Sequence, residues 1–424
     1  MTLARFRSAA DLPLVDDLVA VERPADPMYC LRPAAIEGAA RTFVEGFPGD
    51  VLYAVKCNPD PRALVAVWAG GVRHYDCASL AEVELVRRVL PAEAAIHYMH
   101  PVKARPAIRA AYREHGVRDF SFDSADELRK ILDEAVPVGI NERGERDLGL
   151  FLRLALPKDR GAVYDLSGKF GATFDEAVVL LRTARTRAAT LGLCFHVGSQ
   201  CLDPVAYARA VDYAKSVIDV AGVAVDVVDV GGGFPVSYPD VEPPPLGAYF
   251  AEIEAAFDRL GLPAARLWAE PGRALVAGGA SVVVQVQLRR GDALYVNDGV
   301  YGTLSDAGVP AFRFPVRRIR WSADAAEGDA GAEPPLEAFE LFGPTCDSAD
   351  RMRGPFLLPA DIGEGDWIEI GQLGAYGACL RTAFNGFDRL HTVEVRDPPM
   401  LATPGYGEDG GDADPGFVAD SAAA

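Results

Sequence analysis

Lys56 directly follows the apolar run Val51–Val55. A lysine whose stem is buried at the end of a strand loses part of its hydration, and this favours the neutral amine, the form that makes a Schiff base with an aldehyde. A lysine that merely extends its ammonium from a strand end into water would give the same pattern. Lys56 alone therefore does not decide between a reactive and a solvated amine.

Two further segments combine residue types that suit an anion. Asp229 closes another apolar run and precedes three glycines, Gly231 to Gly233. Such a run lets backbone N–H groups approach a phosphate closely, although a tight turn would also explain it. The segment Glu270-Pro-Gly-Arg273 adds a carboxylate and an arginine, the side chain best suited to phosphate. We therefore expect a phosphate cradle with a carboxylate beside it.

The elements that position these groups alternate between two patterns. Helix-like stretches, two of which open with a capping box (Ser79 with Glu82, Ser124 with Glu127), separate eight short apolar runs. The runs are Val51–Val55, Val72–Tyr75, Ala94–Tyr98, Val117–Phe122, Leu148–Leu156, Leu191–Val197, Val225–Val230 and Arg266–Ala269. The helix-like stretches include Ser79–Leu90, Ser124–Glu134, Phe174–Thr190, Pro204–Ala221 and Leu246–Leu260. This alternation predicts an α/β fold, a (β/α)8 barrel of the TIM type.

Beyond Arg273 the pattern becomes β-rich. The expected strands are Ser281–Leu288, Ala293–Asn297, Phe312–Ile319, Glu337–Phe342 and Trp367–Ile370. We expect residues 30–274 to form the barrel and 275–402 an all-β domain, which the N-terminal segment 1–29 joins. The acidic segment 322–335 is predicted to be a surface loop, and the acidic segment 403–424 a disordered tail.

In such a barrel the catalytic groups lie at the C-terminal ends of the strands, and phosphate binds at the loops after strands seven and eight. Lys56, the three glycines, Glu270 and Arg273 all fall at strand ends. Together they indicate pyridoxal 5′-phosphate as the cofactor, bound by the barrel domain. The combination is far more specific than any one of its parts.

Composition narrows the class of partners. The net charge of −19 argues against nucleic acid or an anionic membrane as the main partner; it suits a cationic substrate, but also plain solubility. Seven cysteines without a CxxC pair and the absence of a secretory signal or a membrane-length apolar run predict a cytoplasmic protein. His97 and His100 have a metal-like spacing, but strand alternation would separate them, and we expect no metal site.

The chain resembles the ornithine/diaminopimelate/arginine decarboxylase family, the fold type III class of pyridoxal-phosphate enzymes. The resemblance covers about residues 30 to 395 and is closest to ornithine or lysine/ornithine decarboxylases. The motifs that carry it are Tyr53-Ala-Val-Lys56-Cys-Asn, Tyr75-Asp76-Cys-Ala-Ser, His196-Val-Gly-Ser199, Gly231-Gly-Gly-Phe, Glu270-Pro-Gly-Arg273, Tyr295-Val-Asn-Asp-Gly-Val-Tyr-Gly302, Gly343-Pro-Thr-Cys346-Asp347, Gly374-Ala-Tyr376 and Phe384-Asn-Gly-Phe387.

This resemblance implies roles for individual residues. Lys56 holds the aldehyde of the cofactor, Glu270 pairs with the pyridine nitrogen, and His196 stacks on the ring. Cys346 donates a proton to the substrate carbon that has lost CO2. The implied phosphate and cofactor contacts are Ser199, Gly231, Gly232, Gly233, Gly272, Arg273 and Tyr376, with Asp76, Glu82 and Arg153 around the ring.

The same resemblance implies a homodimer with shared active sites. Cys346 and Asp347 reach the site of the neighbouring subunit, and Lys169 pairs with Asp350 across the interface. Simpler interpretations remain for several residues: His196 as a satisfied core histidine, Glu82 as a helix cap, Cys346 as a buried thiol, and Tyr376 as a packed aromatic.

The substrate is the least determined feature. A carboxylate at Asp347 suits a distal ammonium, and Tyr301 and Asp306 are predicted to line the same pocket; Asp306 stands in for the second acidic residue that animal-type ornithine decarboxylases carry. We expect ornithine to be decarboxylated to putrescine, a step of polyamine biosynthesis. The alternatives are lysine, meso-diaminopimelate, an amino-acid racemase, and a non-catalytic decarboxylase-like protein that binds regulators.

Overall fold

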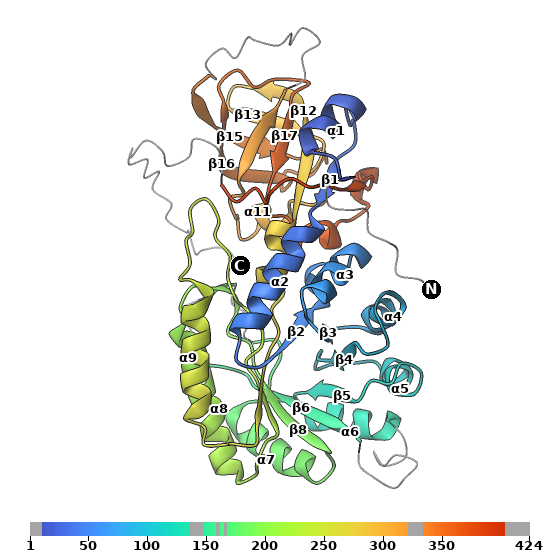
Figure 1. The fold of residues 1–424 in the computed structure, drawn as a ribbon, viewed down its shortest axis with the longest axis vertical. Coiled ribbons are helices and arrows are strands. Elements are labelled where there is room, and N and C mark those ends of the chain that lie inside the picture. The colour runs from blue at the N-terminus through green and yellow to red at the C-terminus, as the bar shows by residue number, and fades with distance from the viewer. Residues whose placement is uncertain (1–10, 136–146, 158–161, 165–167, 321–333, 403–424) are drawn as a thin grey trace.

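The computed structural model describes residues 11–135, 147–157, 162–164, 168–320 and 334–402. Eight parallel strands form a closed barrel in the order of the sequence, with the eighth strand returning to the first. The strands are β2 (Asp50–Ala54), β3 (His74–Cys77), β4 (Ala95–Tyr98), β5 (Asp119–Phe122), β6 (Gly149–Arg153), β8 (Thr190–Cys194), β10 (Val227–Asp229) and β11 (Arg266–Ala269). The predicted TIM-type barrel is confirmed (Figure 1).

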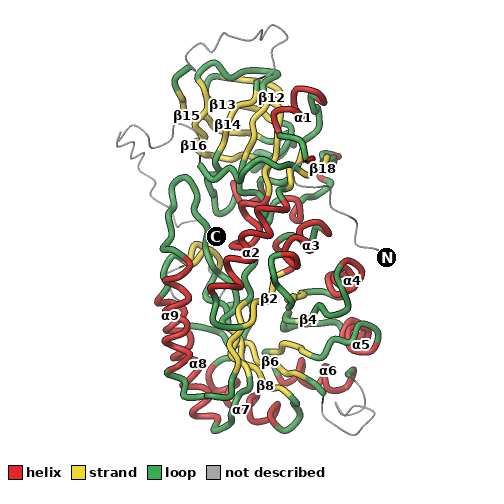
Figure 2. The backbone as a smooth tube through the Cα atoms, in the orientation of Figure 1, coloured by secondary structure: helices red, strands yellow, loops and turns green. Residues whose placement is uncertain are grey.

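Helices surround this barrel (Figure 2). They are α2 (Pro33–Gly46), α3 (Pro61–Ala69), α4 (Leu80–Val89), α5 (Arg105–Arg113), α6 (Ala125–Glu134), α7 (Phe174–Arg185), α8 (Val205–Ala221) and α9 (Leu246–Asp258). The side chain of Ser79 accepts a hydrogen bond from Glu82 N at the start of α4, as its sequence predicts. Helix α7 ends at Arg185, earlier than predicted, because the chain from Thr190 onward enters strand β8.

The second domain is a mixed eight-stranded sheet whose main path runs β14-β17-β12-β13-β15-β16. It contains β12 (Ala280–Arg290), β13 (Ala293–Val296), β14 (Val316–Ile319), β15 (Leu336–Phe342), β16 (Arg351–Pro359), β17 (Trp367–Ile370) and β18 (His391–Glu394). Strands β16 and β18 are additions to the predicted set. In the chain, the short helix α10 (Arg273–Val276) precedes β12, and the short helix α11 (Ser305–Gly308) lies between β13 and β14.

The N-terminal segment enters the sheet after helix α1 (Val15–Glu22). Strand β1 (Met28–Leu31) pairs antiparallel with β12 and parallel with β18. Behind it, the buried guanidinium of Arg32 donates to Glu369 Oε1 (2.7 Å) and to the Ser281 hydroxyl (2.8 Å). One hydrophobic core continues from the barrel into the sheet, so the two domains share a packed junction.

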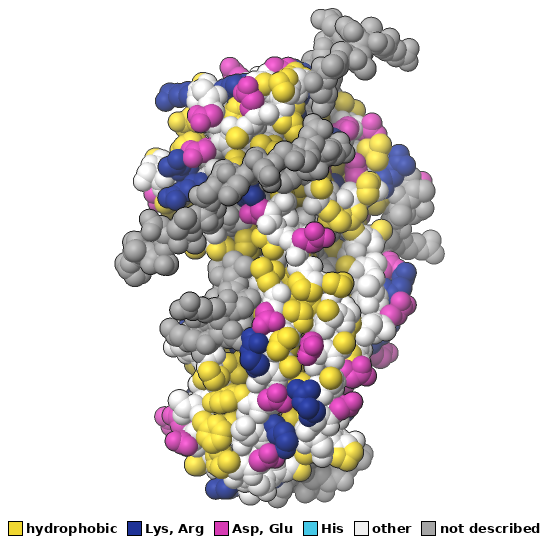
Figure 3. All heavy atoms as spheres, turned by 90° about the vertical axis from the view of Figure 1, so that its left-hand side faces the viewer, with side chains coloured by type: hydrophobic (Ala, Val, Ile, Leu, Met, Phe, Trp, Pro, Cys, Tyr) yellow, Lys and Arg dark blue, Asp and Glu magenta, His cyan; other side chains and the backbone are white. Residues whose placement is uncertain are grey.

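The surface carries both signs of charge. On the face that turns α9 toward the viewer in Figure 3, lysine and arginine side chains are interspersed with aspartate and glutamate. Among the described residues, no helix is long and apolar enough to cross a membrane. The predicted tail 403–424 and most of the predicted loop 322–335 lie outside the described residues.

Candidate active site

Lys56 lies in a 3-10 turn, Val55–Cys57, that directly follows β2. Its Nζ is 3.2 Å from Oδ2 of Asp76, which is buried at the C-terminal end of the neighbouring strand β3. The Asp76 carboxylate raises the pKa of Lys56 and outweighs the opposing effect of burial. Desolvation, which favours the neutral amine, is therefore outweighed in this arrangement: the side chain of Lys56 is 44% exposed and its ammonium pairs with Asp76.

Two acids meet at the ends of strands β10 and β11. Asp229 and Glu270 are both buried, and each carboxyl group acts on the pKa of the other. Burial and the neighbouring carboxylate raise the pKa of Glu270, and burial raises the pKa of Asp229 to about 6. One oxygen of each, Glu270 Oε1 and Asp229 Oδ2, has no hydrogen-bond partner. These two buried oxygens at the barrel mouth therefore lack a hydrogen-bond donor.

His196 follows β8 and faces the same centre. Its Nδ1 accepts a hydrogen bond from Gly198 N (2.9 Å), which leaves Nε2 as the protonated nitrogen of the neutral ring. Burial, followed by the charges of Arg153 and Lys56, lowers the pKa of His196. A neutral, fixed imidazole can stack flat on an aromatic ring.

The three glycines after β10 allow a close approach that side chains would block. Gly231 and Gly233 have positive φ angles of 71° and 103°. A Cβ atom on Gly233 would lie 2.3 Å from Gly198 O, and one on Gly232 would lie 2.7 Å from Glu270 O. The loop before Ser199 and the start of strand β9 (Ser199–Cys201) therefore lie directly against this cradle.

Arg273 begins the short helix α10, and its guanidinium is hydrogen-bonded to side chains of the same chain. Its Nη1 donates to the Tyr238 hydroxyl (2.7 Å) and its Nη2 to Asp306 Oδ2 (3.0 Å). The guanidinium carbon lies 5.1 Å from the ring centre of Tyr376, and Nε is buried without a partner. Asp306 is thus engaged with Arg273, and its predicted role as a receptor for a substrate ammonium stays a prediction.

Tyr376 comes from the sheet domain. Its N–H donates to Cys57 O (2.9 Å), one residue after Lys56, and its φ of 57° is left-handed. A Cβ on Gly272 would lie 2.1 Å from Cys57 Sγ, so the three segments are closely packed. The structure therefore brings together the predicted Lys56, Asp76, Glu270, Arg273 and Tyr376.

Glu82 accepts a hydrogen bond at the start of α4 and is also close enough to Asp76 to feel its charge. Its Oε2 accepts from Ala78 N (2.7 Å), the residue before the N-cap Ser79, so only the Ser79 half of the predicted capping box of α4 is present. Burial raises the pKa of Glu82, and the charge of Asp76 adds to this effect. The capping interpretation and the predicted place near the cofactor are compatible.

A second group of predicted residues lies together on the sheet domain. The Tyr301 hydroxyl donates to Asp347 Oδ2 (2.5 Å), and Cys346 N donates to Asn385 Oδ1 (3.1 Å). The Ala349 N–H and the Tyr301 hydroxyl lower the pKa of Asp347. Cys346 is exposed, which excludes a buried structural thiol. The described part of the chain shows no hydrogen bond or ion pair between this group and Lys56.

Asp350 is buried next to this group and accepts hydrogen bonds from Val300 N (2.8 Å) and from the N–H and hydroxyl of Thr345. Its carboxylate therefore orders the loop that carries Cys346. Lys169 is exposed on the barrel. The Lys169–Asp350 pair between subunits stays a prediction.

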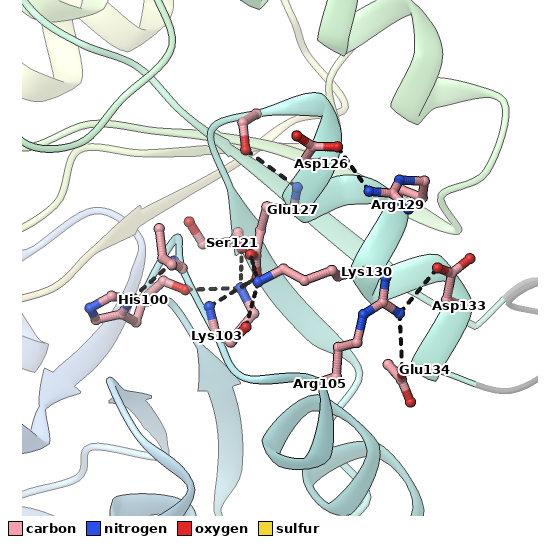
Figure 4. A network of polar contacts seen from close by, with 12 residues as sticks. His100, Lys103, Arg105, Ser121, Asp126, Glu127, Arg129, Lys130, Asp133 and Glu134 are labelled. Carbon is pink, nitrogen blue, oxygen red and sulfur yellow. Dashed lines mark hydrogen bonds and ion pairs between the residues drawn. The ribbon is translucent and has the colours of Figure 1, made fainter.

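Sequence reasoning missed a buried lysine at the loop after β4. Lys103 Nζ donates to His100 O (2.9 Å) and Ser121 O (2.5 Å), and lies 3.0 Å from Glu127 Oε1 (Figure 4). Burial lowers the pKa of Lys103 to about 8. The Glu127 carboxylate pairs with Lys103 and Lys130. The predicted capping box of α6 is therefore only half present, as the bond from Glu127 N to the Ser124 hydroxyl. This network braces the rim of the barrel.

Asp229 and Tyr238 are further residues to which the sequence assigned no role. Asp229 could have been found, because it ends the seventh apolar run as Lys56 follows the first. Tyr238 lies in an irregular segment and offers no comparable signal.

The residues at the barrel mouth fit pyridoxal phosphate. A lysine, a buried carboxyl oxygen without a donor, a buried arginine Nε without an acceptor, and a glycine cradle meet there. A barrel with this set of residues defines the class of pyridoxal-phosphate-dependent enzymes of the barrel fold.

Comparison with known proteins agrees. The pyridoxal binding domain of the pyridoxal-dependent decarboxylases matches residues 34–277, and their C-terminal sheet domain matches residues 279–374. The chain belongs to this family. It is a pyridoxal-phosphate-dependent decarboxylase of a basic amino acid, which confirms the resemblance, the enzyme class and the cofactor expected from the sequence.

Individual relatives differ in substrate. Ornithine decarboxylase of Neurospora crassa is 34% identical over 381 residues, which are 80% of this chain and 74% of that protein. Lysine/ornithine decarboxylase of Selenomonas ruminantium is 32% identical over 362 residues, 83% of this chain and 85% of that one. The arginine decarboxylase of Paramecium bursaria Chlorella virus, solved with agmatine, has a TM-score of 0.76 and 26% identity, and covers 90% of this chain and 99% of its own.

Proposed function

We propose that this enzyme decarboxylates L-ornithine to putrescine and CO2. The observation that carries the proposal is Asp347, whose pKa is lowered by the Ala349 N–H and the Tyr301 hydroxyl and which stands next to Cys346. An ionised carboxylate suits the distal ammonium of ornithine and repels the distal carboxylate of diaminopimelate. The relative from Neurospora crassa is named for ornithine.

Lysine is the second candidate. Arg273 engages Asp306, so the pocket has Asp347 without a free second acid beside it. A single carboxylate fixes one ammonium at a less defined distance than two would. The relative from Selenomonas ruminantium is named for both amino acids.

Pyridoxal phosphate, when bound, supplies an electron sink for the electron pair that remains when CO2 leaves. Lys56 would hold its aldehyde, Glu270 its ring nitrogen and His196 its ring face. Gly231 to Gly233, Ser199, Gly272, Arg273 and Tyr376 would hold its phosphate, and Asp76 and Arg153 would complete the surroundings. Asp347 orients the substrate, and the Cys346 thiol delivers the proton that replaces CO2.

The face that carries Cys346 also exposes apolar side chains. Leu380, Phe384 and Phe387 are 43%, 41% and 45% exposed, and the Phe384 ring lies 5.0 Å from that of Tyr301. Apolar surface of this kind is typical of an interface. We propose that a second copy covers it, so that Cys346 and Asp347 enter the barrel mouth of the partner.

The test is a substrate panel with the purified enzyme and added cofactor. Release of CO2 and of the amine is measured for L-ornithine, L-lysine, L-arginine and meso-diaminopimelate. We expect kcat/KM to be highest for ornithine, followed by lysine. Preference for meso-diaminopimelate or arginine would overturn the proposal. Asp347→Asn should reduce kcat/KM for both ornithine and lysine, because each presents a distal ammonium to this carboxylate.

A further inference from the structure

Asp229 and Glu270 are joined by more than proximity. Asp229 Oδ1 accepts a hydrogen bond from Gly231 N (2.8 Å), and Glu270 N donates to Gly231 O (2.8 Å). Strands β10 and β11 are paired in register, with Asp229 opposite Trp268. Gly231 thus links the backbone of one acid to the side chain of the other, and it holds the two carboxyl groups close enough for each to act on the pKa of the other.

The charges around the pair do not balance. Three carboxyl groups, Asp76, Asp229 and Glu270, interact here with two cations, Lys56 and Arg153. Lys56 is already paired with Asp76. Two further ionisable neighbours, the Cys194 thiol and the His196 imidazole, are neutral, because burial raises the pKa of Cys194 and lowers that of His196. One negative charge is in excess, and a proton removes it.

The hydrogen-bond geometry requires the same proton. Asp229 Oδ2 and Glu270 Oε1 are buried, and neither has a donor. Two adjacent buried carboxylates repel each other strongly, whereas a carboxyl group next to a carboxylate donates to it. A single proton therefore removes the excess negative charge and also supplies the missing hydrogen-bond donor.

We propose that Asp229 and Glu270 hold one proton between them and that Asp229 is the positioning residue that aims Glu270 at the cofactor ring. Glu270 carries the proton and donates to Asp229, which is already oriented by the Gly231 N–H. The ring nitrogen of the cofactor then receives its proton from Glu270 rather than from water. The inference depends on the cofactor and is independent of which amino acid is the substrate.

The first experiment uses infrared difference spectra of the chain without cofactor across the acid-to-alkaline range. The wild type should show a protonated carboxyl C=O band that persists well above the pH at which solvated carboxyls ionise. Asp229→Asn and Glu270→Gln should each remove this band. Asp219→Asn, a solvated aspartate of α8, should leave it unchanged. Absence of the band in the folded wild type, or its survival in the folded Glu270→Gln variant, overturns the proposal.

The second experiment counts protons during cofactor binding. Calorimetric titration with pyridoxal phosphate in two buffers of different ionisation enthalpy gives the net proton uptake. Asp229→Asn should take up about one proton more than the wild type, because the pair no longer supplies it. Equal uptake in both overturns the proposal. Failure of the enzyme to turn over ornithine would leave both readouts unchanged, so the two proposals fail separately.

Discussion

At the barrel mouth, one contact determines the state of the reactive amine. Asp76 raises the pKa of Lys56, so the ammonium must lose a proton before its nitrogen can attack an aldehyde. We expect Asp76→Asn to lower this pKa and to move the pH profile of cofactor incorporation toward lower pH. Asp76→Glu, which keeps the charge, should restore most of the wild-type profile. The growth of visible absorbance after mixing with pyridoxal phosphate measures both, and an unshifted profile in Asp76→Asn would contradict this account.

Among the elements, strand β1 is fixed to the sheet by a buried ion pair. Arg32 and Glu369 have side chains 3% and 2% exposed, and Glu369 also pairs with Arg317. Arg32→Ala leaves a buried charge with one partner fewer and should reduce the free energy of unfolding by about 3–5 kcal/mol. Arg41→Ala, which removes an exposed pair with Glu37 on α2, should change it by about 0.5 kcal/mol or less. Urea unfolding followed by circular dichroism compares the two.

At the N-terminal end of the barrel, strands β3, β4 and β5 contribute a chain of polar contacts. His74 Nδ1 lies 2.9 Å from His97 Nε2, and His97 Nδ1 lies 2.7 Å from Asp119 Oδ2. Asp50 and Arg266 are further charges that act on His74. Burial, followed by His97, lowers the pKa of His74 from 6.5 to about 4.

This shift predicts loss of stability in acid. Between about pH 6.5 and 4 the unfolded chain binds a proton at His74 that the folded chain does not, so the free energy of unfolding falls as the pH falls. His74→Gln should remove part of this slope, whereas His391→Gln, an exposed histidine of β18, should not. The urea midpoint measured at several pH values decides this, and identical slopes in wild type and His74→Gln would refute it.

The sequence predicted the barrel because its strands are short apolar runs separated by capped helices, a pattern that is local in the chain. Strand β16 escaped prediction because Gly354 and Pro355 interrupt its pattern, and β18 because it is short and polar. The ion pair of Lys56 could not be predicted, because Asp76 meets it only through the pairing of β2 with β3. The contact of Asp306 with Arg273 could not be predicted for the same reason, since the fold brings the two residues together.

For the whole molecule, the proposed dimer makes each active site depend on two chains. Lys56→Ala and Cys346→Ala should each be nearly inactive alone. Mixing them under conditions that exchange subunits should restore about a quarter of the wild-type activity, because half of the dimers then contain one intact site. Activity that stays at the level of the separate variants, with exchange verified, would contradict shared sites.

The position of β1 has a consequence for folding during synthesis. Among the strands that the structure describes, this one leaves the ribosome first, yet β12 and β18, the neighbours on its two edges, are made only after the entire barrel. Chains fold during synthesis as their segments become available, and unpaired edges invite wrong partners. The barrel can therefore mature while the earliest strand waits, and the sheet closes only when nearly the last described residues have been translated.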